Sequence, residues 1–278
     1  MRRACGIALG IAAAALVAAA GSPGAAPKPH ALLLFVRWQG EADSRLYLLD
    51  VDTRRETRVT RQDAVEPDWA RDGARIAYST DLATQDFPAL AIATLKGTLH
   101  RVLSEEGSYN YPAWSPSGRL IAFEFIANDG SRNPMPEVGV VGSDGRGQRI
   151  LGPDVGDTRP TWSPESKRLA YAGPDGLRVV SPRGGASRLV APDAFQNPAW
   201  SPRGTKIAFV SPKGLEVVRP DGTGRQVVAR VAGRRIAFVD FTNYDGGPIY
   251  VVSAGGGEPQ RVTPASDDDT EPVWRPRA

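Results

Sequence analysis

The sequence predicts an all-β protein and, within that class, a six-bladed β-propeller. A Pro-x-Trp phrase occurs five times, and its Trp-to-Trp steps of 45, 48, 38 and 74 residues have the period of a four-stranded blade. The double-length last step indicates one degraded copy. No segment after Pro29 carries apolar residues at helical spacing over a useful length. The phrases begin, three residues before each Trp, at Glu66, Tyr111, Arg159, Asn197 and Glu271.

The N-terminal residues lie outside the predicted domain. Arg2 and Arg3 precede an Ala-rich apolar run over residues 4–20, and small residues follow. This pattern predicts a secretory signal peptide at 1–26 and a linker at 27–31, before a propeller at 32–278. An uncleaved anchor is the alternative, since the run has the minimum length for a membrane span. Either way we expect export to the periplasm or the extracellular space, with no membrane span after signal removal.

Charge and cysteine content exclude several function classes. The formal net charge is +3, and Arg2 and Arg3 supply two of these charges, so the exported chain is nearly neutral and no nucleic-acid partner is expected. The single cysteine, Cys5, belongs to the signal, so the mature protein has no disulfide and must rely on its core. The sequence contains two histidines, His30 and His100, which excludes a zinc site built from His and Cys. A Ser-His-Asp catalytic triad would have to use His100.

Each repeat predicts four strands in a fixed order. The inner strand carries Pro-x-Trp, because Pro suits a strand with a free edge, and Trp supplies a large surface to bury between blades. A type I turn follows, as in the Ser-Pro-x-Gly segments 115–118 and 201–204. The second strand is continuously apolar, with Ile-Ala-Tyr or a close variant, as in a strand buried on both faces. These strands are predicted at 75–78, 120–123, 168–171 and 206–209.

The outer half of each blade is less apolar. Third strands are predicted at 89–95, 137–141, 176–180, 215–218 and 248–252. Turns that contain Gly lead to short polar outer strands such as 148–151 and 187–190. Polar outer strands protect an exposed edge from aggregation.

The two chain ends complete one another. Residues 32–35, 45–49 and 57–60 resemble second, third and fourth strands, and the missing inner strand is 271–274. A composite blade of 32–60 plus 271–275 therefore closes the ring. The other blades are predicted at approximately 66–104, 111–151, 159–191, 197–228 and 229–263. Ala229 replaces Trp in the last of these, so we expect residues 226–229 to serve only one blade, at an irregular seam.

The phrase Pro-x-Trp-Ser-Pro-x-Gly followed by Ile-Ala-Phe resembles the repeat of TolB-like β-propellers, the PD40 or WD40-like repeat family. The resemblance covers nearly the whole mature chain, apart from departures such as Ala70-Arg71 and Glu165-Ser166. It implies a propeller that lacks the N-terminal α/β domain of TolB itself. Members of this group serve as periplasmic scaffolds, as sugar-acting enzymes and as gating domains of proteases. No Gly-x-Ser-x-Gly elbow occurs here, which excludes a protease within this chain.

The first candidate site is the channel mouth. Residues just before the inner strands gather there in propellers, which places Glu66, Tyr111, Arg159, Asn197 and Glu271 together. Glu66 and Glu271 belong to adjacent blades and Arg159 lies opposite, so we expect a funnel that is acidic on one side and basic on the other. Glu66, Asp68 and Glu271 are candidate ligands for Ca²⁺. The alternative is that these side chains pair with each other or with loop backbone. Residues 267–269 either join them or form a solvated acidic loop.

The second candidate site is a wall of long loops on the same face. Loops between second and third strands are long at 37–44, 81–88, 127–136 and 241–247, but short at 173–176 and 211–214. Apolar and aromatic side chains in the wall suit partner contact, and ordinary loop packing is the alternative. The candidate wall residues are Trp38, Phe87, Tyr109, Met135, Phe241 and Tyr244, beside Tyr111.

With complete repeats and no catalytic constellation, the sequence favours a non-enzymatic, monomeric scaffold without a cofactor. We expect it to bind a protein or peptide partner in the cell envelope through the loop-rich face. The alternative is a Ca²⁺-dependent propeller enzyme that acts on carbohydrates or lactones, or a small-ligand sensor, at the channel mouth.

Overall fold

The computed structural model of the chain describes residues 31–38, 43–80, 88–96, 98–103, 107–128, 130, 134–153, 159–194, 196–211, 214–227, 235–239, 249–253, 260–263 and 268–274. Every helix or strand in these ranges is a β-strand, which confirms the predicted all-β class. Within the same ranges there is no helix suited to crossing a membrane.

The strands form antiparallel sheets whose order follows the repeats. The first sheet contains β23 (Asp268–Trp274), β1 (Leu32–Trp38), β2 (Ser44–Asp50) and β3 (Arg55–Arg58). The second contains β4 (Val65–Trp69), β5 (Arg75–Thr80), β6 (Ala89–Thr94) and β7 (Leu99–Leu103). The third contains β8 (Gly107–Trp114), β9 (Leu120–Ala127), β10 (Glu137–Gly142) and β11 (Arg149–Pro153).

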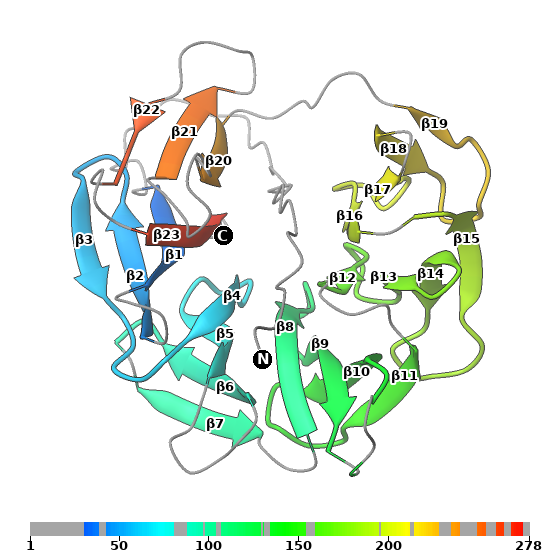
Figure 1. Cartoon of the computed structure of the whole chain (residues 1–278), viewed down its shortest axis with the longest axis horizontal. Helices are drawn as coiled ribbons and strands as arrows, with labels where there is room; N and C mark the ends of the chain where they lie inside the picture. The colour runs from blue at the N-terminus through cyan, green and yellow to red at the C-terminus, as the bar shows by residue number, and fades with distance from the viewer. Residues whose placement is uncertain are drawn as a thin grey trace, which may run out of the picture.

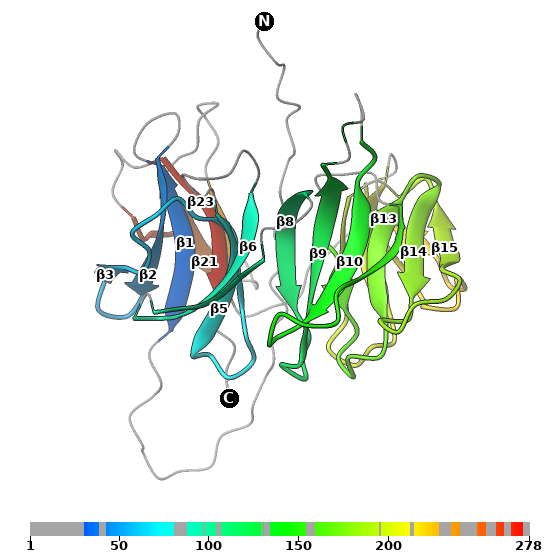
Figure 2. The ribbon, with the colours of Figure 1, turned by 90° about the horizontal axis from the view of Figure 1, so that it is seen from below.

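The fourth sheet contains β12 (Thr161–Trp162), β13 (Leu169–Gly173), β14 (Gly176–Val180) and β15 (Arg188–Pro192). The fifth contains β16 (Gln196–Trp200), β17 (Ile207–Ser211), β18 (Gly214–Val218) and β19 (Gln226–Val227). The described strands of the sixth are β20 (Arg235–Val239), β21 (Ile249–Ser253) and β22 (Gln260–Arg261). Figure 1 shows the sheets around one centre, with β4, β8, β12, β16 and β23 innermost. From the side, neighbouring sheets stand face to face (Figure 2).

The C-terminal strand joins the N-terminal strands in one sheet, as predicted. β23 pairs antiparallel with β1, and Leu33 lies opposite Trp274. The pairing extends to Asp268 opposite Trp38 and Asp269 opposite Arg37. The expectation of a solvated loop at 267–269 was therefore wrong for Asp268 and Asp269, because the ladder continues over them.

The Ser-Pro-x-Gly turns also form as predicted. In the turn after β8, Gly118 N–H donates to the Ser115 carbonyl at 2.8 Å, and Leu120 N–H donates to Ser115 Oγ at 3.0 Å. Gly118 has φ +69°, which Gly adopts without the steric cost that a side chain brings. Ser166 occupies the equivalent position with φ +60°, so the turn survives where the sequence lacks Gly.

A β-bulge recurs at the x-Pro step of the inner strands. Pairing shifts by one residue between Val65 and Asp68, between Asn110 and Ala113, and between Gln196 and Ala199. β23 carries the same shift against β1. The inner strands β4, β8, β16 and β23 thus begin before the Pro, whereas β12 begins at Thr161, just after it. The bulge accommodates a residue without an N–H at the free edge.

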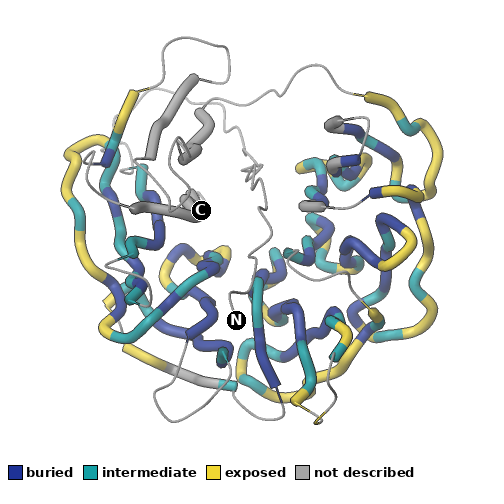
Figure 3. Tube along the Cα trace, in the orientation of Figure 1, coloured by how far each residue is buried: buried dark blue, intermediate teal, exposed yellow. Residues whose placement is uncertain are grey.

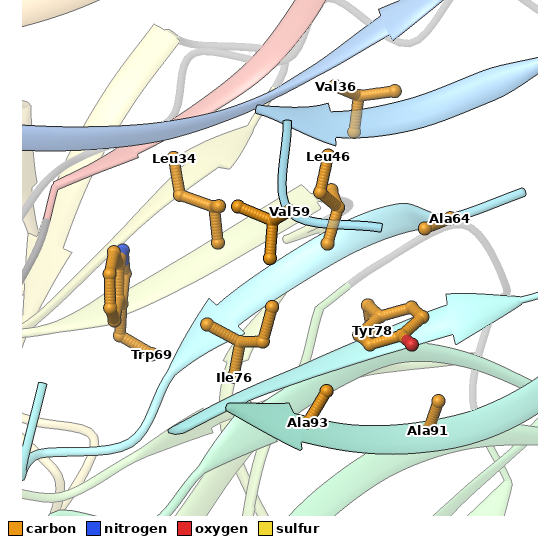
Figure 4. Close-up of a cluster of buried hydrophobic side chains, with 10 residues drawn as sticks. All are labelled: Leu34, Val36, Leu46, Val59, Ala64, Trp69, Ile76, Tyr78, Ala91 and Ala93. Atoms are coloured by element: carbon orange, nitrogen blue, oxygen red, sulfur yellow. The ribbon is translucent and has the colours of Figure 1, made fainter. Parts of the chain in front are cut away.

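Four inner-strand tryptophans whose side chains the structure describes pack between two neighbouring sheets. Trp69 contacts a cluster from the first and second sheets that includes Leu34 and Ile76 (Figure 4). Trp114 joins the second sheet to the third, Trp162 the third to the fourth, and Trp200 the fourth to the fifth. This confirms the predicted role of the repeated Trp.

Polar contacts reinforce these seams toward the rim. The Arg75 guanidinium lies over the Trp114 ring at 4.9 Å, and Arg168 lies over Trp200 at 5.0 Å. Farther out, Arg149 of β11 donates to the Pro182 carbonyl of the next sheet at 3.3 Å. Burial therefore concentrates on the inner and middle strands, and the outer strands are largely exposed (Figure 3).

We predict that Trp114→Ala lowers the free energy of unfolding by about 3–5 kcal/mol, since it empties a seam between two sheets. Trp114 is only 5% exposed. Urea unfolding followed by circular dichroism measures the change. Met135→Ala, at an exposed position, is the control and should change stability by less than about 0.5 kcal/mol. Equal effects of the two substitutions would contradict the role of the seam.

Candidate functional site

The bulge determines how side chains are presented at the channel mouth. Glu66 and Tyr111 occupy the same position in consecutive inner strands and have φ +57° and +51°. This left-handed conformation is costly for residues other than Gly, Asn and Asp. Both residues immediately precede the Pro of the bulge. The structure therefore maintains the conformation by contacts around it.

Glu66 supplies the main contact. Its side chain is buried, and Oε2 accepts hydrogen bonds from Ser79 Oγ at 2.8 Å and from Tyr111 N–H at 2.6 Å. Ser79 belongs to the same sheet, whereas Tyr111 belongs to the next one. One carboxylate thus joins the bulges of β4 and β8. This arrangement matches the alternative in which the Glu side chain binds backbone.

Asp68 makes a second link across the same seam. Its Oδ2 accepts the Trp114 N–H at 2.6 Å. The residue is half-buried, and burial of its carboxyl group raises its pKa above the ordinary value of 3.8, opposed by the Arg159 charge and by backbone hydrogen bonds. Two acceptors of β4 therefore bind two backbone donors of β8.

Arg159 lies on the acidic side of the mouth rather than opposite it. It precedes β12 of the fourth sheet, yet Nη1 donates to the Pro67 carbonyl of β4 in the second sheet at 3.3 Å. Its charge also opposes the rise in the pKa of Asp68 that burial causes. The predicted separation into an acidic and a basic half was therefore wrong for Arg159, because its side chain extends past the third sheet.

Tyr109 was wrongly predicted to belong to the exposed wall. It is only 2% exposed, and its ring packs against Phe123 and Phe125 with centroids 5.2 Å away in each case. Its hydroxyl donates to Gln148 Oε1 at 3.1 Å. The side chain points from β8 into the seam, so it is not accessible to a partner.

The remaining candidate residues are exposed, half-buried or outside the described residues. Met135 is 60% exposed between β9 and β10. Trp38 is half-buried at the end of β1 and packs against the cluster around Leu34, and Tyr111 is half-buried in β8. Phe87, Phe241 and Tyr244 lie outside the described residues, as do the side chains of Asn197 and Glu271.

The metal hypothesis rests on carboxylates that already have partners. Glu66 and Asp68 each use an oxygen to bind β8. Among the side chains that the structure describes, no group of three or more His, Cys, Asp and Glu residues is placed to hold a metal ion. Glu271, the third proposed ligand, is outside that set.

Sequence reasoning missed two buried acids, Glu124 of β9 and Glu216 of β18, each 1% exposed. Asn110 Nδ2 donates to Glu124 Oε1 at 3.2 Å. A charged residue inside the apolar run Leu-Ile-Ala-Phe-Glu-Phe-Ile at 120–126 is the signal that could have found Glu124, since such a residue is rarely buried without a partner.

Comparison with known proteins supports one family. The family model PD40, described as the TolB beta propeller domain, matches residues 11–203. No curated protein matches the chain. Among solved structures, TolB from Acinetobacter baumannii superposes with a TM-score of 0.65 at 19% identity, covering 89% of this chain and 67% of that one.

Two further solved structures are similar in fold. A putative TolB from Agrobacterium tumefaciens gives a TM-score of 0.59 at 19% identity and covers 85% of this chain and 99% of that one. An oligogalacturonate lyase in complex with manganese gives 0.54 at 13% identity and covers 78% and 70%. These identities show a shared fold alone, and the fold is common to a lyase and to TolB proteins.

We predict that Asp68→Asn stabilises the protein at neutral pH, because Asn keeps an acceptor for Trp114 N–H but cannot ionise. A raised folded-state pKa means that the stabilising contribution of Asp68 is complete below its unfolded pKa and is lost as pH rises through the folded pKa. The difference in the free energy of unfolding between the variant and the wild type should therefore shrink as pH falls toward about 3. Urea unfolding across this pH range measures it.

Asp72→Asn is the matched control, and its effect on stability should depend on pH in the opposite direction. Burial raises the pKa of Asp72, but hydrogen bonds from Ala74 and Arg75 outweigh this and lower it. Its contribution is therefore present at neutral pH and lost on acidification. An Asp68→Asn variant that is less stable than the wild type at pH 7, with a pH-independent difference, would contradict the assignment.

Proposed function

Because the chain belongs to the PD40 family of TolB beta propeller domains, we propose that its six sheets are the blades of one closed propeller. The composite blade is 32–60 with 271–275, inside a domain of 32–278 that follows a signal peptide at 1–26. The pairing of β1 with β23 supports closure. An exported, monomeric scaffold that binds a protein or peptide partner in the cell envelope is the function that we assign to it.

The asymmetry of the loop-rich face is the observation that carries this proposal. In the fourth and fifth sheets the ladder between the second and third strands extends to Gly173 opposite Gly176 and to Ser211 opposite Gly214, so only two residues separate the paired strands. In the third sheet the ladder between β9 and β10 ends at Phe125 opposite Glu137. A longer connection there carries the exposed Met135. Long connections beside short ones suit a partner that lies against the longer loops.

Contacts at the channel mouth favour a scaffold over a metal-dependent enzyme. Glu66 and Asp68 bind the backbone of β8, so a cation that recruited them would have to compete with two hydrogen bonds across a seam. The similarity to a manganese-bound lyase concerns the fold alone. We therefore assign no cofactor to this site and place binding on the wall.

A photo-crosslinking amino acid at Met135 should capture an envelope protein in an extract of the source cells, because this side chain is 60% exposed on the wall. The same amino acid at Leu189, which is 40% exposed on β15, is the control and should capture nothing specific. Excess unlabelled wild-type protein should abolish the product. Crosslinking from Leu189 alone, or equally from both positions, would contradict binding at the wall.

A further inference from the structure

We propose that the open edge of β3 binds an extended acidic peptide segment by strand addition. The surface, here called the basic edge, consists of β3 (Arg55–Arg58) with the flanking residues Arg54 and Arg61. It lies on the outer rim of the first sheet (Figure 1). It is therefore a second surface, separate from the loop-rich face, and it does not depend on the function proposed for that face.

The backbone of β3 is available on one side. Among the described strands, β3 is the last of its sheet and pairs with β2 alone. Val59 N–H donates to the Leu46 carbonyl at 2.7 Å, and bonding to a neighbour alternates along an antiparallel strand. The N–H and C=O groups of Glu56 and Arg58 consequently point away from β2, where a partner strand can pair with them.

The arginines of the basic edge have no side-chain partner in the part of the chain that the structure describes. All four arginines, Arg54, Arg55, Arg58 and Arg61, are exposed. Glu56, the acid within the strand, is occupied by Arg37 at 2.8 Å. Carboxylates of a partner can therefore form charge-assisted hydrogen bonds with these guanidinium groups.

Arginines at three other outer strands, β11, β15 and β19, contact the neighbouring sheet. Arg149 of β11 and Arg188 of β15 donate to carbonyls of the next sheet, at Pro182 and Pro220. Arg225, just before β19, donates to the carbonyl of Pro192 at the end of β15 at 2.9 Å. These arginines hold sheets together, whereas those of β3 extend to solvent, as the exposed trace of β3 in Figure 3 illustrates.

The distribution of charge favours a peptide over a membrane surface. Side chains alternate across a strand, so Arg55 and Arg58 lie on opposite faces of the sheet edge. An added strand also alternates, and its carboxylates reach both faces. A flat anionic surface meets only one of them. The same charges repel a second basic edge, which disfavours pairing between copies of this chain.

The test uses the mature chain and a fluorescent synthetic peptide in which glutamate and valine alternate. Fluorescence anisotropy at low salt should show saturable binding that weakens as salt is added. The double variant Arg55→Glu with Arg58→Glu should weaken binding at least tenfold. The matched control, Arg183→Glu with Arg203→Glu, changes two exposed arginines of other sheets and should leave binding unchanged.

Two further measurements separate strand addition from simple charge attraction. Arg58→Pro removes an N–H that points to the open edge, which an edge strand tolerates, and it should weaken binding more than Arg58→Gln does. A peptide N-methylated on its backbone should bind at least tenfold more weakly than its parent. Thermal unfolding of each variant confirms that the fold is retained.

The proposal is overturned if both double variants bind the peptide alike, or if the N-methylated peptide binds as tightly as its parent. Binding of phosphatidylglycerol vesicles that requires Arg55 and Arg58, without binding of the peptide, would overturn it in favour of a membrane contact. Crosslinking at Met135 tests the loop-rich face, whereas peptide binding tests the basic edge. Failure of one experiment therefore does not decide the other.

Discussion

The structure depends above all on the burial of inner-strand tryptophans against the neighbouring sheet, as seen at Trp69, Trp114, Trp162 and Trp200. A lone four-stranded sheet that is apolar on both faces is not stable in water. The inner strands solve this with alternate side chains: Trp69 packs toward the first sheet, while Asp68 reaches the third. The phrase of β4 therefore contributes to the seams on both sides of its sheet, which gives a structural reason for its repetition.

The same phrase sets the geometry of the channel mouth. In β4 and β8 the strand bulges at the x-Pro step, and the residue before the Pro, Glu66 or Tyr111, lies in the left-handed region. The Glu66 carboxylate then stabilises the next bulge through the Tyr111 N–H. Since the backbone fixes this position, its side chain can differ from repeat to repeat. Variation at the mouth is thus compatible with a constant frame.

Features with one dominant physical cause were predictable from the sequence. Trp burial follows from the size of the side chain, and the Ser-Pro-x-Gly turns follow from the φ preferences of Pro and Gly. The chain ends pair because the N-terminal strands lack an inner strand of their own. Contacts between distant residues were not predictable, because spacing alone does not show that Arg159 reaches the Pro67 carbonyl. Tyr109 was misjudged since an aromatic residue near a loop has the same sequence signature whether it is buried or exposed. The positions of Phe87, Phe241 and Tyr244 in the wall stay predictions.

The central claim is that the carboxylates of Glu66 and Asp68 belong to the frame of the channel mouth rather than to a ligand site. Amide hydrogen exchange of Tyr111 and Trp114, followed by NMR on the isolated protein, tests it most directly. Both N–H groups donate to these carboxylates, so slow exchange is expected, with Glu66→Ala accelerating exchange at Tyr111 far more than at Trp114. Fast exchange of both amides in the wild type would contradict the claim, since the carboxylates would then be free to bind a ligand.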